Sequence, residues 1–189
     1  MIRLLSLALL LTALAAGAHA DPHDIRVSEL AAAPVLGPKG ERLGRIAHVF
    51  LSVQGNGVSY AELAFRDRAG EEKRFAYPVN AFRRSPQALA LNVPPAHLEK
   101  SDELELRADR RFVEAREVIG YPVDDRIGNR VGLLDDVVLN LESGRTRQYL
   151  VVFDDRPQAA LPLPANLLTL QSGANPVMHA DPHRRAALR

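Results

Sequence analysis

The sequence of 189 residues contains no cysteine and no tryptophan. Without cysteine the chain can form no disulfide, cannot carry a lipid on an N-terminal cysteine and offers no thiol nucleophile. The stability of the fold must therefore come from apolar cores. The chain is long enough for one medium domain or two small ones.

A large excess of either charge is also missing. The chain carries 24 basic and 23 acidic side chains, which gives a formal net charge of +1. Nucleic-acid binding needs clustered positive charge and usually stacking aromatic side chains, and aromatic residues make up only 5% of this chain. We therefore expect no nucleic-acid partner.

Long hydrophobic runs are absent after the first twenty residues, MIRLLSLALLLTALAAGAHA. This segment combines Arg3, an apolar run over residues 4–16 and the small-x-small triplet that ends at Ala20. That pattern predicts a secretory signal peptide cleaved after Ala20. The alternative is an uncleaved membrane anchor. Such an anchor needs about 20 apolar residues to cross the bilayer, and this run is shorter. We expect a periplasmic or secreted protein with no integral membrane segment after processing.

What the chain does contain is an internal repeat. The stretch PVLGPKGERLG, residues 34–44, matches PVDDRIGNRVG, residues 122–132, when the chain is shifted by 88 positions. The register continues without a gap to Phe65 and Phe153, and the matched residues are apolar side chains, glycines and prolines. These residue types determine cores and turns, so the pattern indicates a structural duplication.

Each copy has the texture of a β protein. Short runs rich in Val, Leu, Ile and Phe alternate with turn clusters, and strands are expected near 43–53, 58–66, 131–141 and 146–153. The matched Gly40 and Gly128 suit turn positions with positive φ. A second echo, YPVNAF at 77–82 and LPLPANLL at 161–168, aligns Pro78 with Pro162. The predicted fold class is all-β, with two tandem small antiparallel β-barrels, and a pair of sandwiches is the alternative.

The predicted organisation has five parts. They are a signal peptide at 1–20, a first repeat at 25–93, a charged linker at 94–112, a second repeat at 113–171 and a flexible tail at 172–189. Pro95 could open a short helix that runs to Lys100 within the linker.

The residues of both copies resemble the PRC-barrel domain, which is shared by the photosynthetic reaction-centre H subunit and a ribosome maturation factor. The similarity covers roughly 25–93 and 113–171, with one departure, because Ala32 stands where the second copy has Gly120. The family positions are Leu30, Val35, Gly40, Gly44 and Pro78 in the first copy, and Val118, Gly120, Val123, Gly128, Gly132 and Pro162 in the second. The resemblance implies a small all-β binding or docking module without catalysis, and it transfers no active-site residue.

Histidines near both ends form the best metal candidate. The sequence HADPH occurs at 19–23 and again at 179–183. Cleavage after Ala20 would place His23 third from the new amino terminus, but Pro22 has no N–H, so the square-planar copper or nickel site cannot form there. His179, Asp181 and His183 could supply ligands in the tail but lack a fixed frame. We expect no metal and no cofactor, and these four residues remain weak candidates.

No catalytic constellation is apparent. The chain has no serine in a G-x-S-x-G elbow, and the Asp pairs at 124–125, 135–136 and 154–155 show no calcium-loop spacing. Asp136 matches His48 of the first copy, so this position has different chemistry in the two repeats. We expect a protein that is not an enzyme.

The two copies differ in charge. Residues 25–96 carry ten basic and six acidic side chains, whereas residues 112–177 carry six and nine. The candidate partner-binding cations of the first copy are Arg66, Arg68, Lys73, Arg74, Arg83 and Arg84. The sequence predicts an adaptor that docks a protein partner in the cell envelope or associates with itself, and the alternative is a small-ligand or metal-binding periplasmic protein that uses the histidine-bearing ends.

Overall fold

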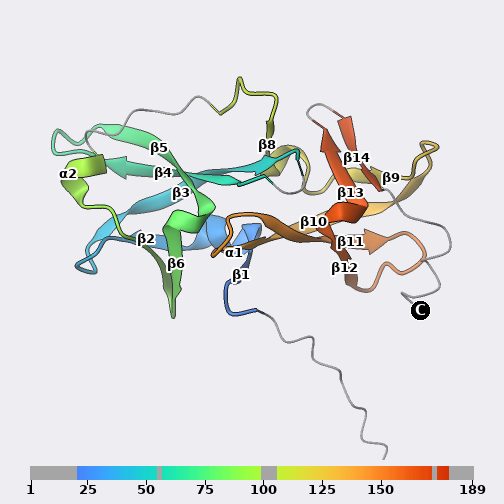
Figure 1. Cartoon of the computed structure of the whole chain (residues 1–189), viewed down its shortest axis with the longest axis horizontal. Coiled ribbons are helices and arrows are strands. Elements are labelled where there is room, and N and C mark those ends of the chain that lie inside the picture. The colour runs from blue at the N-terminus through green and yellow to red at the C-terminus, as the bar shows by residue number, and fades with distance from the viewer. Residues whose placement is uncertain (1–20, 55–56, 99–105, 172–173, 179–189) are drawn as a thin grey trace, which may run out of the picture.

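The computed structural model describes residues 21–54, 57–98, 106–171 and 174–178, and these residues form a mostly β structure (Figure 1). The predicted β class is therefore confirmed. The signal peptide predicted at 1–20 and most of the tail lie outside the described residues. Within the described part of the chain, no helix is both long and apolar enough to cross a membrane.

The first sheet is built from residues 34–91. Its strand order is β5-β4-β3-β2-β7-β6, and all neighbours are antiparallel except β2 and β7. The strands are β2 (Pro34–Leu36), β3 (Arg42–Ser52), β4 (Tyr60–Arg66), β5 (Glu72–Pro78), β6 (Phe82–Ser85) and β7 (Ala88–Leu91). The 3₁₀ turn η1 (Val79–Ala81) joins β5 to β6, and the helix α2 (Pro95–Leu98) follows β7.

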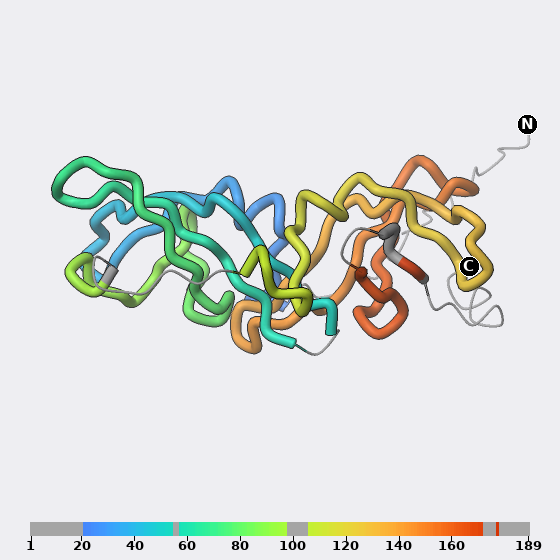
Figure 2. Tube along the Cα trace, turned by 90° about the horizontal axis from the view of Figure 1, so that it is seen from above, coloured from blue at the N-terminus to red at the C-terminus, as the bar shows by residue number. Residues whose placement is uncertain are grey.

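The second sheet repeats this order with residues 122–178. It runs β12-β11-β10-β9-β14-β13, and β9 and β14 form its parallel pair. The strands are β9 (Pro122–Asp124), β10 (Arg130–Asn140), β11 (Thr146–Phe153), β12 (Ala160–Pro164), β13 (Leu168–Gln171) and β14 (Ala174–Met178), with η3 (Ala165–Leu167) between β12 and β13. The two sheets lie end to end and give an elongated molecule (Figure 2).

The matched glycines have clear structural reasons. Gly40 and Gly128 have φ values of 77° and 83°, as the sequence predicted for their turns. Gly44 and Gly132 lie where the long strand meets its neighbour so closely that a Cβ would fall 2.1 Å from Ala64 O and 2.3 Å from Val152 O. Only glycine fits these two equivalent positions without a shift of backbone.

The leading strand of each half pairs with the sheet of the other half. β1 (Asp24–Arg26) lies antiparallel to β10, and β8 (Phe112–Glu114) lies antiparallel to β3. The registers are equivalent, because Leu51 faces Val113 and Leu139 faces Ile25, each pair being related to the other by 88 positions. We call β8 beside β3 the first junction, and β1 beside β10 the second junction. The two halves are therefore joined by a reciprocal exchange of strands.

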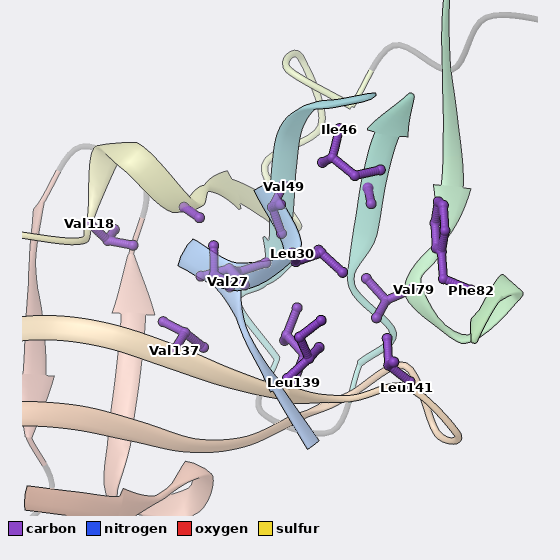
Figure 3. Packing of buried hydrophobic residues seen from close by; sticks show 14 of the residues in the cluster. Val27, Leu30, Ile46, Val49, Val79, Phe82, Val118, Val137, Leu139 and Leu141 are labelled. Atoms are coloured by element: carbon purple, nitrogen blue, oxygen red, sulfur yellow. The ribbon is translucent and has the colours of Figure 1, made fainter. Parts of the chain in front are cut away.

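A single apolar core runs through both junctions. The helix α1 (Val27–Ala32) follows β1 and packs against both β3 and β10. Leu30 of this helix is fully buried and lies between Val49 of β3 and Leu139 of β10 (Figure 3). The equivalent segment of the second half is the shorter 3₁₀ turn η2 (Ala115–Glu117), and Gly120 at φ 87° follows it. Ala32, which stands where the second half has Gly120, is instead the last residue of α1. The sequence difference at this position therefore corresponds to a different turn.

Two expectations need correction. Among the described residues, β5 does not pair with β6, nor β12 with β13, so the sheets are open and do not form closed barrels. A 3₁₀ turn at a corner separates each pair of end strands, and β6 and β13 have only four residues each. The structural equivalent of Pro78 is Pro164 and not Pro162, because Pro78 and Pro164 each precede the 3₁₀ turn of their own half. The helix α2 is described over Pro95–Leu98, and the expected extension to Lys100 lies outside the described residues.

Candidate functional site

The main cluster of charged side chains lies at the first junction. Here His48 of β3 sits between Glu114 of β8 and Glu62 of β4, and only 11% of its side chain is exposed. His48 and Glu62 face each other because β3 and β4 pair them directly, while Glu114 of the exchanged strand pairs with Phe50, two residues along β3 from His48. The site therefore forms only when the two halves are joined.

Glu114 is the centre of this cluster. Its carboxylate is 4% exposed and lies 2.6 Å from His48 Nδ1, 2.7 Å from Arg107 Nη1 and 2.5 Å from Arg116 Nε. A buried carboxylate is costly to remove from water unless such donors surround it. Because carboxylate oxygens accept, His48 Nδ1 carries the proton that it donates to Glu114.

The other side of the imidazole faces a mixed environment. His48 Nε2 lies 3.4 Å from Arg74 Nη1, which can only donate, so Nε2 accepts here. Glu62 Oε1 is 3.8 Å from both Nε2 and Arg74 Nη1, and this buried oxygen accepts no hydrogen bond from the described residues. The imidazole thus bridges a fully paired carboxylate and a poorly paired one.

Aromatic rings support the cluster from one side. The guanidinium of Arg107 lies 5.6 Å from the centre of the Phe50 ring, and Phe112 meets Tyr60 edge to face at 5.4 Å. Phe50 and Phe112 both lie at the junction, because β3 pairs residues 50–52 with β8. Aromatic and cation–π contacts of this kind hold an arginine in place without removing it from water.

The second junction has different chemistry at the equivalent positions. Asp136 takes the place of His48 and is 4% exposed. It accepts a hydrogen bond from Ser28 Oγ at 2.5 Å and another from the backbone N–H of Val137 at 2.8 Å. Ser28 corresponds to Arg116 in the 88-residue register. One junction therefore uses ionic pairs, and the other a hydroxyl and a carboxylate.

The structure does not bring the six predicted basic residues into one patch. Arg66, Arg68, Lys73 and Arg74 belong to the hairpin of β4 and β5, while Arg83 and Arg84 lie on β6. Lys73 pairs with Glu71 of the same hairpin at 2.8 Å, and Arg84 pairs with Glu29 of α1 at 2.5 Å. Such exposed pairs contribute little stability.

Two further contacts show how the hairpin charges interact. Arg74 donates to Glu72 at 2.8 Å, and this hydrogen bond, together with the charge of Arg74, holds the pKa of Glu72 below its usual range. Arg83 Nη1 donates to the backbone oxygen of Asn80 at 2.6 Å. Arg74 therefore binds a carboxylate within the hairpin, whereas Arg83 binds a backbone oxygen beside β6.

Of the four weak metal candidates, only His23 belongs to the described residues. The backbone N–H of His23 donates to Asp21 at 2.9 Å, and its carbonyl accepts from Leu141 at 2.8 Å. His179, Asp181 and His183 lie outside the described residues. Among the residues that are described, no group of three or more His, Asp or Glu side chains could hold a metal ion.

Tyr149 of β11 gives a prediction about alkaline pH. Burial raises the pKa of its hydroxyl to about 12, and a hydrogen bond with Thr146 opposes the shift. The unfolded chain loses this proton near pH 10, so stability is intact below about pH 10 and falls as the pH rises to about 12, by about 1.4 kcal/mol per pH unit. We expect Tyr149→Phe to flatten this loss in denaturant unfolding measured from pH 8 to pH 12. The half-exposed Tyr121 provides the control variant Tyr121→Phe, and an equal slope in parent and Tyr149→Phe would contradict the prediction.

Part of this site is visible in the sequence. The contrast between His48 and Asp136 was visible in the repeat, whereas Glu114 lies 66 residues from His48 and gave no local signal. Only the strand exchange brings them together. No curated protein matches the chain. Residues 22–98, in the first half, match the family model of the PRC-barrel domain.

Proposed function

We propose that this protein is an exported, non-enzymatic adaptor that docks a protein partner of the cell envelope or a second copy of itself. The observation that supports this is the end-to-end arrangement of the two sheets (Figure 2). Residues 25–96 have a net charge of +4 and residues 112–177 a net charge of −3. The charge difference in the sequence therefore becomes a separation of charge along the molecule.

We also infer that residues 113–171 form a second unit of the PRC-barrel kind. The family model matches only the first half, but the second sheet has the same strand order. The equivalent long strands β3 and β10 each have eleven residues and pair in equivalent registers. Two similar units with opposite charge offer two docking surfaces of different specificity.

The β-hairpins are the best candidates for these surfaces. The hairpin of β4 and β5 carries Arg66, Arg68, Lys73 and Arg74 around its turn. The equivalent turn between β11 and β12 carries Asp154 and Asp155, and Arg130 of the neighbouring strand pairs with Asp154 at 3.1 Å. Opposite charges at equivalent turns favour an acidic partner for the first hairpin, or head-to-tail contact between copies.

Affinity capture tests the proposal. The mature protein, tagged at its C-terminus, would be captured from gently extracted envelope at low and at moderate salt, and bound proteins identified by mass spectrometry. We expect one stoichiometric partner that is lost at moderate salt and in Arg66→Glu/Arg68→Glu, because exposed charges are screened. The matched control is Arg126→Glu/Arg156→Glu in the second half.

The two forms of the proposal give different results. Capture of untagged copies of the chain, with salt-dependent mass in sedimentation experiments, would indicate self-association. Capture of nothing under any condition would contradict docking. A cytoplasmic location of the full-length protein in cell fractionation would contradict export.

A further inference from the structure

The two junctions are equivalent in backbone but not in charge. In the first, Phe50 pairs with Glu114, and in the second, Val138 pairs with Arg26. Each of these pairs is related to the other by 88 positions, so Glu114 and Arg26 occupy equivalent places on the two leading strands. The duplication has therefore placed opposite charges at one structural position.

The receiving strands differ in the same way. β3 presents His48 to its leading strand, and β10 presents Asp136. In the observed pairing, Glu114 meets a histidine and two arginines, and Asp136 meets the hydroxyl of Ser28. Glu114 and Asp136 thus both have hydrogen-bond donors in the observed pairing.

Pairing each leading strand with its own half would reverse this. Arg26 would then take the place of Glu114 beside His48, and Glu114 would lie beside Asp136. The first of these arrangements leaves His48 without the carboxylate that accepts from Nδ1 and places an arginine there instead, and the second buries two carboxylates side by side. Like charges in contact are unfavourable in a sheet, and more so when they are buried.

We propose that positions 26 and 114, together with positions 48 and 136, specify which leading strand each long strand accepts. His48 favours the pairing of β3 with β8, which carries Glu114. Asp136 disfavours the pairing of β10 with β8 and permits its pairing with β1. Each half consequently pairs with the other half and not with another copy of the same half. This selectivity is a property of the junctions and does not depend on the adaptor function.

Cysteine reporters can test the selectivity, since the chain has no native cysteine. Asp24 pairs with Asn140, and their side chains are within 3.1 Å, so Asp24→Cys/Asn140→Cys reports the observed pairing. Ser52 is the equivalent of Asn140 on β3, so Asp24→Cys/Ser52→Cys reports the reversed pairing. Both forms would be refolded at low concentration in a thiol–disulfide buffer, and the disulfide yield measured in the monomer.

We expect only the first reporter to form in the parent sequence. Interchanging the receiving residues in His48→Asp/Asp136→His should lower the ratio of the first reporter to the second by about tenfold. Adding Arg26→Glu/Glu114→Arg should restore the ratio, because the glutamate of a leading strand again faces a histidine and not an aspartate. Restoration distinguishes selection by charge from a general loss of packing.

The matched control interchanges two exposed equivalent residues away from the junctions, Lys39→Ile/Ile127→Lys, and should leave the ratio unchanged. An unchanged ratio in His48→Asp/Asp136→His would overturn the proposal. If that variant does not fold, failure of the fourfold variant to recover the first reporter would overturn it as well.

Discussion

Cleavage of the chain within residues 99–105 is expected to leave the two halves bound to each other. Each half supplies a strand to the sheet of the other, and α1 of the first half packs on β10 of the second. Separation would expose the shared core and remove one strand from each sheet. Because the contact includes buried apolar side chains as well as strand pairing, it resembles an obligate interface.

A specific protease site introduced within residues 99–105 allows the measurement. After cleavage at about 1 μM protein, we expect a single species in size-exclusion chromatography with light scattering, whose mass is the sum of the two fragments. Denaturant should separate the fragments, and the uncleaved protein with the same site is the control. Two species that separate in native buffer would show that the halves are independent domains.

Replacing Leu30 with alanine should destabilise both halves at once. Leu30 is fully buried in α1 and lies between the two long strands (Figure 3). Removal of a buried leucine side chain leaves a cavity and lowers the free energy of unfolding by about 3 kcal/mol. Since the cavity lies in a core that both sheets share, we expect one shifted transition and not the loss of one half alone.

Denaturant unfolding followed by circular dichroism and by hydrogen exchange would show this. Exchange should increase together in β3 and β10. The control is Ile127→Ala, because this side chain is 83% exposed and its removal should change stability by less than about 0.5 kcal/mol. Two separate transitions in Leu30→Ala, with one sheet still protected, would contradict a shared core.

The sequence predicted local structure well where a residue type has one physical role. The long strands expected near 43–53 and 131–141 appear as β3 and β10, and the turn glycines Gly40 and Gly128 have the expected positive φ. The third-strand corner was less well predicted. Pro162 and Pro164 both fit a strand end by composition, and the pairing of Gln148 with Pro164, like that of Tyr60 with Pro78, identifies the equivalent of Pro78.

The strand exchange could not be predicted from the pattern. β1 and β8 occupy equivalent positions in the two copies, so either could pair with either long strand by apolar alternation alone. The distinction lies in single charged residues such as Glu114, whose partners are distant in sequence. The candidate site was therefore visible as two unlike residues, His48 and Asp136, without the contacts that explain them.

The pairing of β1 with β10 also has a consequence for the order of events in time. Synthesis begins at the N-terminus, so Asp24 is made early, yet its partner Asn140 follows 116 residues later. The edge of β3 likewise stays unpaired until β8 has been synthesised. A growing chain can complete the first sheet only after β8 has emerged and the second only after β14, and contacts of such long range fold slowly. A chain interrupted before β8 would thus expose the unpaired edge of β3, which makes it readily distinguished from the finished protein.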